Sequence, residues 1–182
     1  MKRGVRAVGL AESFRSQTST LAAAVVRADR VVDGFGFDTC TVGGTDATQT
    51  IQSVLIDLER EDIGYVMLGA VAPAWYNIVD LQAVAETLEI PVLAVTFEAS
   101  SGLESAIRSA FDGAERADRL ERYRSLPERE PVQVGNGETV YVRAVDLSTE
   151  EAATVVKAFT PSGGRPEPLR VARLAARAAN RL

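Results

Sequence analysis

The chain has 182 residues, of which 46% are apolar and 25% are charged, a balance typical of one globular domain spanning residues 1–182. It contains no histidine and one cysteine, Cys40, which excludes Ser-His-Asp and Cys-His catalysis, histidine-containing zinc sites and internal disulfides. Carboxylate chemistry with a hard metal such as magnesium, lysine chemistry, and binding without chemistry remain. The apolar runs are far shorter than the roughly 20 residues of a membrane span, and no signal-peptide pattern follows Met1, so we expect a cytoplasmic protein without membrane contact.

Positive charge is concentrated near the end of the sequence. The net charge is −5, and Lys2 and Lys157 are the only lysines among 20 basic residues. From Arg165 onward, five arginines and one acid, Glu167, give a local charge of +4, which leaves −9 on the preceding residues. An acidic surface repels a polyanion, whereas a gathered basic segment attracts one. The asymmetry therefore predicts a local anion site.

The first third of the chain has the pattern of three strands. Residues 4–10, 20–26 and 31–42 are rich in β-branched side chains, and polar breaks at 13–19 and 27–30 separate them. Breaks of this length suit antiparallel connections. These strands are therefore predicted to form an antiparallel meander.

The next segments alternate between helix and strand. Apolar residues recur at helical spacing over 47–59 and 77–88, whereas 65–71 and 91–97 are short apolar runs typical of strands buried on both faces of a sheet. A strand-helix-strand order predicts a right-handed parallel crossover. We expect the first of these buried strands to pair with the first strand of the meander.

The last third adds two predicted helical regions around a hairpin. Residues 103–126 are helical in pattern but heavily charged, with a break at Gly113, which indicates a solvent-exposed excursion. The tripeptide 135–137 contains glycines and asparagine that tolerate positive φ, so a hairpin is predicted there. A capping box beginning at Ser148 opens one more helix, and the last helix begins at Pro166. The fold class predicted from these patterns is one α/β domain with a mixed sheet, an antiparallel meander followed by parallel crossovers.

Four arginines share one face of the last predicted helix. At 100° per residue they fall within a stripe roughly 80° wide. The residues are Arg170, Arg173, Arg177 and Arg181. One interpretation is a solvated face that complements the helix dipole, and the other is a phosphate-binding face. In the second interpretation Arg170 and Arg173 matter most, because they lie nearest the amides of the helix N-terminus.

Trp75, Tyr76 and Asn77 follow the buried strand 65–71 and precede a helix, where open α/β sheets place their ligands. Aromatic rings at such a position can stack on a nucleobase. The alternative is that Trp75 covers the core and Asn77 caps the helix. The residue types alone leave both interpretations open.

Two carboxylates are predicted at the ends of strands. Asp46 lies at a strand-to-helix turn, where it either coordinates a metal or caps the helix in a capping box with Gln49. Glu12 is expected just past the first strand, as a second oxygen ligand or as an exposed turn residue. We expect the turns at Ser13, Asp46 and Trp75 to converge on one end of the sheet.

Seven short motifs, in this order and spacing, resemble those of the archaeal endonuclease-V-like family known as domain of unknown function 99. They are Gly9-Leu10, Val32-Asp33-Gly34, Gly44-Thr45-Asp46-Ala47-Thr48, Met67-Leu68, Asn77-Ile78-Val79-Asp80, Ile90-Pro91-Val92 and Pro166-Glu167-Pro168-Leu169-Arg170. Members of that family are often labelled deoxyuridine endonucleases. The resemblance covers nearly the whole chain and implies an RNase-H-like mixed sheet with helices on both faces. It also implies magnesium-dependent phosphodiester hydrolysis, with manganese as a substitute metal and DNA, or RNA in its place, as the partner.

The chain departs from that family pattern at the acids. An Asp-Asp pair follows the first strand of the family, where this chain has Ala11 and Glu12. The family has an aspartate after Met-Leu, where this chain has Gly69, and a histidine in the last helix, where this chain has Arg173. These departures leave two hypotheses.

The first hypothesis is a metal-dependent endonuclease acting on deaminated, uracil-containing DNA. In it Glu12 and Asp46 are the catalytic metal ligands. Its nucleic-acid-binding residues are Trp75, Tyr76, Asn77, Arg170 and Arg173. The second hypothesis is a catalytically inactive homologue that binds nucleic acid or a protein partner through the same cleft.

Overall fold

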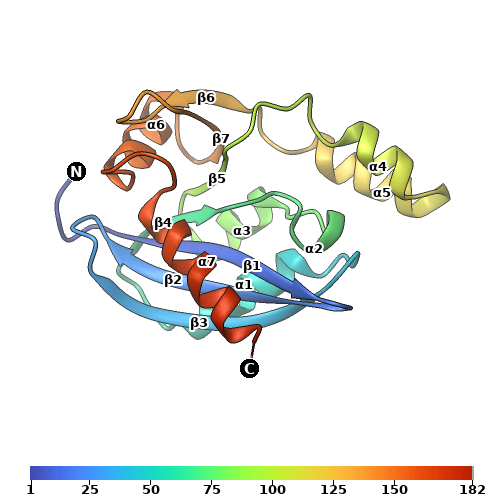
Figure 1. The fold of residues 1–182 in the computed structure, drawn as a ribbon, viewed down its shortest axis with the longest axis horizontal. Helices are drawn as coiled ribbons and strands as arrows, with labels where there is room; N and C mark the ends of the chain where they lie inside the picture. Colours follow the sequence, from blue (N-terminus) through green and yellow to red (C-terminus); the bar gives the residue numbers. More distant parts are fainter. Residues whose placement is uncertain (182) are drawn as a thin grey trace.

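The computed structural model describes residues 1–181, and seven strands in this range form one mixed sheet in the order β3-β2-β1-β4-β5-β7-β6 (Figure 1). The strands are β1 Arg6–Arg15, β2 Thr18–Arg27, β3 Val32–Thr41, β4 Ile63–Leu68, β5 Val92–Thr96, β6 Glu130–Gln133 and β7 Thr139–Val145. The helices are α1 Ala47–Asp57, α2 Pro73–Tyr76, α3 Leu81–Leu88, α4 Glu104–Ala110, α5 Gly113–Arg124, α6 Thr149–Ala158 and α7 Glu167–Ala179. No helix in the described range combines the length and apolar composition needed to cross a membrane.

The predicted meander is confirmed, because β1 pairs with β2 and β2 pairs with β3, both antiparallel. The predicted break at 13–19 is wrong in extent. Ser13 lies inside β1 opposite Thr20, and the turn contains only Ser16 and Gln17. Ser16 adopts a φ of 58°, which tightens the turn. The backbone ladder continues through polar residues because its hydrogen bonds do not depend on apolar side chains.

The predicted crossovers are confirmed as well. β1 pairs in parallel with β4, and β4 pairs in parallel with β5. The predicted helix 77–88 begins later than expected, since α3 starts at Leu81 with the Asp80 side chain accepting a hydrogen bond from Ala83 N at 3.0 Å. The predicted hairpin around 135–137 is confirmed by the antiparallel pairing of β6 with β7.

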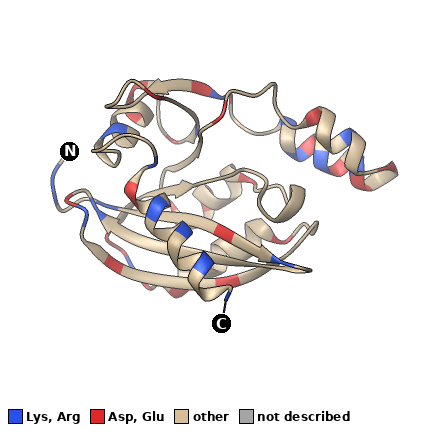
Figure 2. Ribbon diagram, viewed as in Figure 1, with Lys and Arg blue, Asp and Glu red and all other residues tan. Residues whose placement is uncertain are grey.

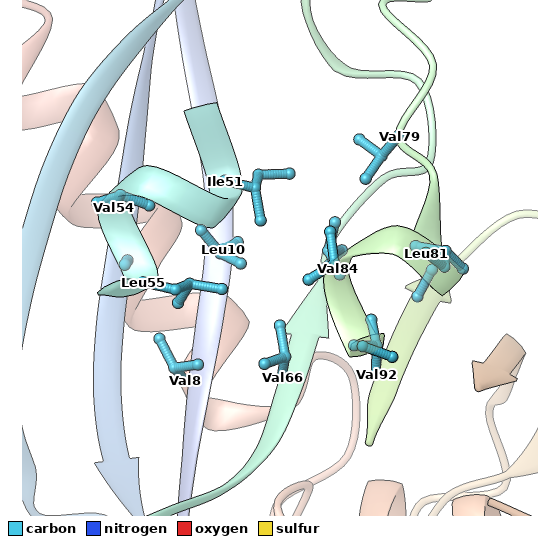
Figure 3. Packing of buried hydrophobic residues seen from close by; sticks show 14 of the residues in the cluster. Val8, Leu10, Ile51, Val54, Leu55, Val66, Val79, Leu81, Val84 and Val92 are labelled. Atoms are coloured by element: carbon cyan, nitrogen blue, oxygen red, sulfur yellow. The ribbon is translucent and has the colours of Figure 1, made fainter. Parts of the chain in front are cut away.

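Helices cover both faces of the sheet, as predicted. On one face, Ile51 and Leu55 of α1 and Val84 of α3 pack against Val8 and Val66 of the sheet (Figure 3). On the other face, a second cluster joins α6 and α7 to the sheet. Its members include Met67, Leu93, Val155, Phe159 and Leu169. The alternation of side chains along each strand places successive residues in these two cores.

Helix α7 lies across β1 and β2 (Figure 1). A Cβ atom at Gly9 would overlap the backbone of Pro168 and would lie 2.7 Å from Leu169 N. Only glycine therefore permits α7 to approach β1 this closely. This contact fixes the position of the first turns of α7 relative to the carboxyl ends of β1 and β4.

The charged segment predicted at 103–126 forms α4 and α5, which separate at Gly113, where φ is 55°. The two helices project from the sheet with positive and negative side chains interspersed along them (Figure 2). One side is apolar and buried, since Ile107, Phe111 and Leu120 pack against Ile78. The excursion is therefore anchored to the segment that follows β4.

Candidate nucleic-acid interface

A cavity of about 280 Å³, which we call the central pocket, lies beside the carboxyl ends of the parallel strands β1 and β4. Its lining residues come from β1, β2, β4, α1, the segment after β4 with the first residue of α2, and α7 with the loop before it. They are Leu10, Ala11, Glu12, Leu21, Ile51, Leu68, Gly69, Ala70, Pro73, Arg165, Leu169 and Arg173. Gly69 N donates to Leu10 O at 3.0 Å, and beyond that bond β4 has ended while β1 continues. Open α/β sheets bind ligands at such strand ends.

Glu12 is the one carboxylate among the residues that line the central pocket. It lies within β1 rather than just past it, so its predicted place in a turn is wrong. Its Oε2 atom accepts a hydrogen bond from Ser19 Oγ of β2. One hydroxyl donor satisfies only part of a carboxylate's capacity, so Glu12 retains lone pairs for a ligand in the pocket.

Two arginines supply the positive charge of the central pocket. Arg173 of α7 and Arg165 of the preceding loop both line it. Neither forms an ion pair within 4 Å in the described part of the chain. Burial, followed by the like charges of Arg173 and Arg177, lowers the pKa of Arg165. With two guanidinium groups against the single Glu12 carboxylate, the pocket favours an anion.

Arg165 was missed by the sequence analysis except as part of a charge count. It lies in a loop, where no helical or strand spacing marks a residue for function. The remaining members of the predicted arginine stripe do not line the central pocket. Arg170 pairs with Glu167 of its own helix, with Nη2–Oε1 at 2.6 Å, and Arg177 and Arg181 are exposed.

Asp46 belongs to a different arrangement, which we call the Asp46–Asn77 junction. Its carboxylate accepts from Thr41 N at 3.1 Å, from Thr41 Oγ1 at 2.8 Å and from Asn77 Nδ2 at 2.6 Å. Asn77 Nδ2 also donates to Thr41 O at 2.9 Å, and Asn77 Oδ1 accepts from Ala47 N at 2.9 Å. Burial raises the pKa of Asp46, but the hydrogen bonds from Asn77 and Thr41 outweigh it and lower the pKa overall.

Two capping predictions are wrong at this junction. Asp46 makes no side-chain cap bond to α1, and Asn77 caps the first turn of α1 instead of its own helix. The reason is that the Asp46 carboxylate accepts hydrogen bonds from Thr41, at the end of β3, and from Asn77. Asn77 is fully buried with its amide fully used, so it reaches no nucleic acid while the junction is closed.

Glu12 and Asp46 do not line one common cavity, as the ligands of a preformed divalent metal centre would. Hard cations require several oxygen ligands that converge on one point. Asp46 does not line the central pocket, and its oxygens already accept hydrogen bonds from protein donors. Within residues 1–181, no group of three or more Asp, Glu, Cys or His side chains is arranged to hold a metal ion. Glu12 is thus the one acid of the central pocket, and metal binding by Glu12 with Asp46 stays a prediction.

An exposed aromatic cluster lies beside the Asp46–Asn77 junction. The ring of Trp75 lies 5.0 Å from that of Phe111 and 5.8 Å from that of Tyr76, and 55% of Trp75 is exposed. Trp75 therefore covers part of the buried cluster that contains Phe111 and leaves the rest of its ring exposed. The Arg119 guanidinium lies 3.9 Å from the centre of the Phe111 ring and donates to Gly43 O. The exposed Trp75 ring can accept a stacked base.

The backbone of this cluster is strained. Ala74, Trp75 and Tyr76 have φ values of 48°, 57° and 60°, in the left-handed region that disfavours residues with a Cβ. Runs of such residues occur at ligand-binding segments, where the surrounding structure holds them in place. Here Gly43 N donates to Ala74 O at 2.7 Å, and Trp75 packs over Gly43.

The structure brings the predicted site residues together in three groups. Glu12 and Arg173 share the central pocket, Asp46 and Asn77 share the junction, and Trp75 lies in the aromatic cluster. The predicted convergence of turns at one end of the sheet holds for Asp46 and Trp75, which are linked through Gly43 and Asn77. Ser13 itself lies inside β1 and not in a turn, but the turn that follows β1 reaches the same end, where Val42 N donates to Gln17 O at 3.0 Å.

Comparisons with known proteins agree with this geometry. The sequence model of a family described as endonuclease dU matches residues 3–180. A UPF0215 protein from Pyrobaculum calidifontis is 33% identical over 172 residues, which is 93% of each chain. A crystal structure of a protein of unknown function from Archaeoglobus fulgidus is similar with a TM-score of 0.84 and 26% identity, covering 96% of this chain and 98% of the other.

The fold is also similar to that of an endonuclease V. The structure of the Ciona intestinalis enzyme, in complex with a DNA containing an inosine followed by a ribo-adenosine, gives a TM-score of 0.65 at 12% identity. The match covers 97% of this chain and 86% of that protein. The predicted RNase-H-like fold and the resemblance to the archaeal endonuclease-V-like family are therefore confirmed.

Proposed function

Because the chain belongs to the endonuclease dU family, we propose that it binds nucleic acid across the central pocket, with uracil-containing, deaminated DNA as its substrate class. One observation carries this proposal. Ala11, Gly69 and Arg173, the positions where the sequence departs from the family pattern, line a single pocket together with Arg165. Compared with the family pattern, the pocket lies at the same place in the fold, but Ala11 and Gly69 stand where the family has acids and Arg173 adds a positive charge.

This exchange favours binding over cleavage. Carboxylates hold a divalent cation that in turn contacts phosphate, whereas a guanidinium contacts phosphate directly through its fork of N–H donors. Arg173 and Arg165 therefore take the phosphate itself. Loss of metal ligands weakens both water activation and charge stabilisation, so cleavage is expected to be weak. In this proposal the protein recognises a lesion for DNA repair more effectively than it cuts.

The aromatic cluster supports the same proposal. Trp75 is exposed at the same end of the sheet as the central pocket, and its ring offers a stacking surface to a base. Such stacking contributes about 1–3 kcal/mol per base. The contacts of the Trp75 ring with Phe111 and Gly43 hold the ring in place before a ligand binds. A ring that is already fixed loses little conformational entropy on binding.

The test is the salt dependence of DNA binding. Uracil-containing single- and double-stranded DNA are titrated at several salt concentrations by fluorescence anisotropy. Arg173→Ala is expected to reduce the slope of log affinity against log salt by about 0.7–0.9, the value of one phosphate contact. Arg181→Ala removes an equal charge from an exposed residue beyond the end of α7 and is expected to leave the slope unchanged. Equal slopes for both variants and the parent would contradict the proposal.

A second candidate function is a metal-dependent endonuclease with residual activity, favoured by the Glu12 carboxylate in the central pocket. The pocket has room for the missing acids. A Cβ at Gly69 would lie 3.6 Å from Leu10 O, an ordinary contact, and Ala11 already carries its own. The double variant Ala11→Asp with Gly69→Asp is expected to cleave uracil-containing DNA in magnesium faster than the parent. If it folds and cleaves nothing, the idea of a degraded nuclease site is wrong.

A further inference from the structure

A second cavity, which we call the arginine chamber, adjoins the central pocket. Its volume is about 410 Å³, within the range of roughly 300–1,000 Å³ typical of ligand sites. The side chains of Arg129, Arg143 and Arg165 line it, and it shares Gly69, Ala70 and Arg165 with the central pocket. Arg165 therefore stands between the two cavities and faces both.

Each of the three arginines is held against an aromatic ring. The guanidinium carbon lies 3.9 Å from the ring centre of Phe97 for Arg165, and 4.2 Å from that of Tyr141 for Arg129. For Arg143 the distance to the ring centre of Tyr123 is 5.5 Å. Stacking fixes a guanidinium group while leaving N–H donors at its edge free. The three charges are thus oriented before any ligand binds.

The protein neutralises none of the three by a direct ion pair. Arg129 donates to Glu98 O at 2.6 Å and to Ser100 Oγ at 3.1 Å, and Arg143 donates to Pro127 O and to Tyr123 Oη. Eight other arginines of the described chain form ion pairs within 4 Å, but these three form none. The three guanidinium groups of this cavity therefore keep their positive charge available to a ligand.

Charge in the arginine chamber defines the class of ligand. Three guanidinium groups and one carboxylate, that of Glu98, line it, which leaves two positive charges without a partner. The pKa of Arg165 is lowered by burial and by the like charges of Arg173 and Arg177, so a nearby anion would relieve this repulsion. A phosphodiester carries one negative charge, whereas a phosphomonoester carries about −1.5 to −2 at neutral pH.

We propose that the arginine chamber binds a phosphomonoester, supplied by the terminal phosphate of a nucleic-acid strand whose adjoining nucleotide lies in the central pocket. The shared wall at Gly69 and Ala70 allows one strand to occupy both cavities. The strand as the source of the phosphate rests on the proposed function. The preference of the chamber for a doubly charged phosphate rests on its own three arginines.

Oligonucleotides of one sequence test the proposal, carrying a 5′-phosphate, a 3′-phosphate or hydroxyl groups at both ends. We expect a phosphate at one of the two ends to tighten binding about tenfold in fluorescence anisotropy. Arg129→Gln is expected to abolish that difference and to change the affinity of the hydroxyl-ended strand less than twofold. Arg3→Gln, an exposed arginine before the opposite end of β1, is the matched control and should retain the difference.

Inorganic phosphate provides a second measurement that needs no nucleic acid. It is expected to raise the melting temperature of the parent and of Arg3→Gln, but not of Arg129→Gln. Because Arg143 also supports Pro127 and Tyr123, Arg143→Lys is the conservative variant and should retain part of the effect. Circular dichroism of each variant verifies that it is folded.

The outcomes separate this inference from the proposed function. Equal affinity for phosphorylated and hydroxyl-ended strands, with binding itself intact, overturns the inference and leaves the proposed function standing. No binding of any strand, with a phosphate effect that Arg129→Gln removes, overturns the proposed function and assigns the chamber to a free phosphomonoester. No strand-end difference and no effect of inorganic phosphate would falsify the chamber as a phosphate site.

Discussion

The central pocket and the Asp46–Asn77 junction each contain one acid that the sequence marks as a metal ligand, yet their chemistry differs. Glu12 accepts from a single hydroxyl and faces a cavity, whereas the Asp46 carboxylate accepts from both Thr41 and Asn77 and lines no part of that cavity. Both residues are carboxylates that the sequence predicts near the end of a strand. A carboxylate is available to bind a ligand only where other side chains of the protein do not already donate hydrogen bonds to its lone pairs.

The largest expected effect is a loss of stability when a substitution displaces α7 and so disrupts the central pocket. Gly9→Ala places a Cβ against the backbone of Pro168 and Leu169, which cannot move aside as a side chain can. We expect a loss of about 3 kcal/mol in the free energy of unfolding, the upper end for overpacking. Urea denaturation measures it. Gly4→Ala, where a Cβ meets nothing within 4 Å, is the control and should stay within about 0.5 kcal/mol of the parent.

The second-largest effect is expected from a substitution that disrupts the Asp46–Asn77 junction. Asn77→Ala removes the buried amide that bonds Thr41 O, Asp46 Oδ1 and the buried Ala47 N. Leaving such groups without partners is expected to cost about 2 kcal/mol of the free energy of unfolding. Gln82→Ala on the exposed face of α3 controls for the loss of a side-chain amide. A loss as small as that of Gln82→Ala would mean that Asp46 is held by Thr41 alone.

A smaller effect follows from the pH dependence of the same joint. The pKa of Asp46 in the folded chain lies below its ordinary value of 3.8, because the hydrogen bonds from Asn77 and Thr41 outweigh burial. A depressed folded pKa stabilises the fold above the unfolded pKa, and this stability is lost as pH falls through the folded pKa. On acidification below about pH 4, the gap in stability between the parent and Asn77→Ala should therefore narrow. A constant gap across that range would contradict the role of Asn77.

The smallest expected effect is a change in the pKa of Cys40, which responds to the carboxylates of both regions. Burial, followed by the charges of Asp46, Glu12 and Asp38 in that order, raises the pKa of this thiol to about 11. Glu12→Gln is therefore expected to lower the thiol pKa slightly, in a titration followed by thiolate absorbance. The matched variant Glu61→Gln lies in the loop before β4, where the charge does not act on Cys40. An unchanged Cys40 titration in Glu12→Gln would show that the Glu12 carboxylate is too well solvated to act.

Sequence patterns predicted the elements and their pairing because local periodicity marks them. The period of the side chains identified the meander and the buried strands β4 and β5, and it separated α4 from α5 at Gly113. It failed at the start of α3 and at the cap of α1. There Asn77 bonds to Thr41, Asp46 and Ala47, which lie 30 to 36 residues away in the sequence.

The candidate site was predictable only in part, for the same reason. Arg173 was found through its helical spacing, and Glu12 through its place near the end of a strand. Arg165 lies in a loop, and Arg129 and Arg143 lie before and within the hairpin of β6 and β7, without a motif. The antiparallel pairing of β5 with β7 brings the hairpin beside the segment after β4, and no local signal shows that pairing.

The central pocket is built from three distant stretches of chain, with β1 and β4 forming one wall and α7 the other. Loop-closure entropy disfavours such contacts until the intervening sheet has formed, so the docking of α7 comes late in folding. The reverse process, local undocking of α7, is then an opening that leaves the sheet paired. A ligand that touches both walls binds only the docked state. The binding free energy of such a ligand is therefore added to the free energy that holds α7 docked. A bound nucleic acid would then protect the amides of α7 from hydrogen exchange, although most of these amides do not contact the nucleic acid.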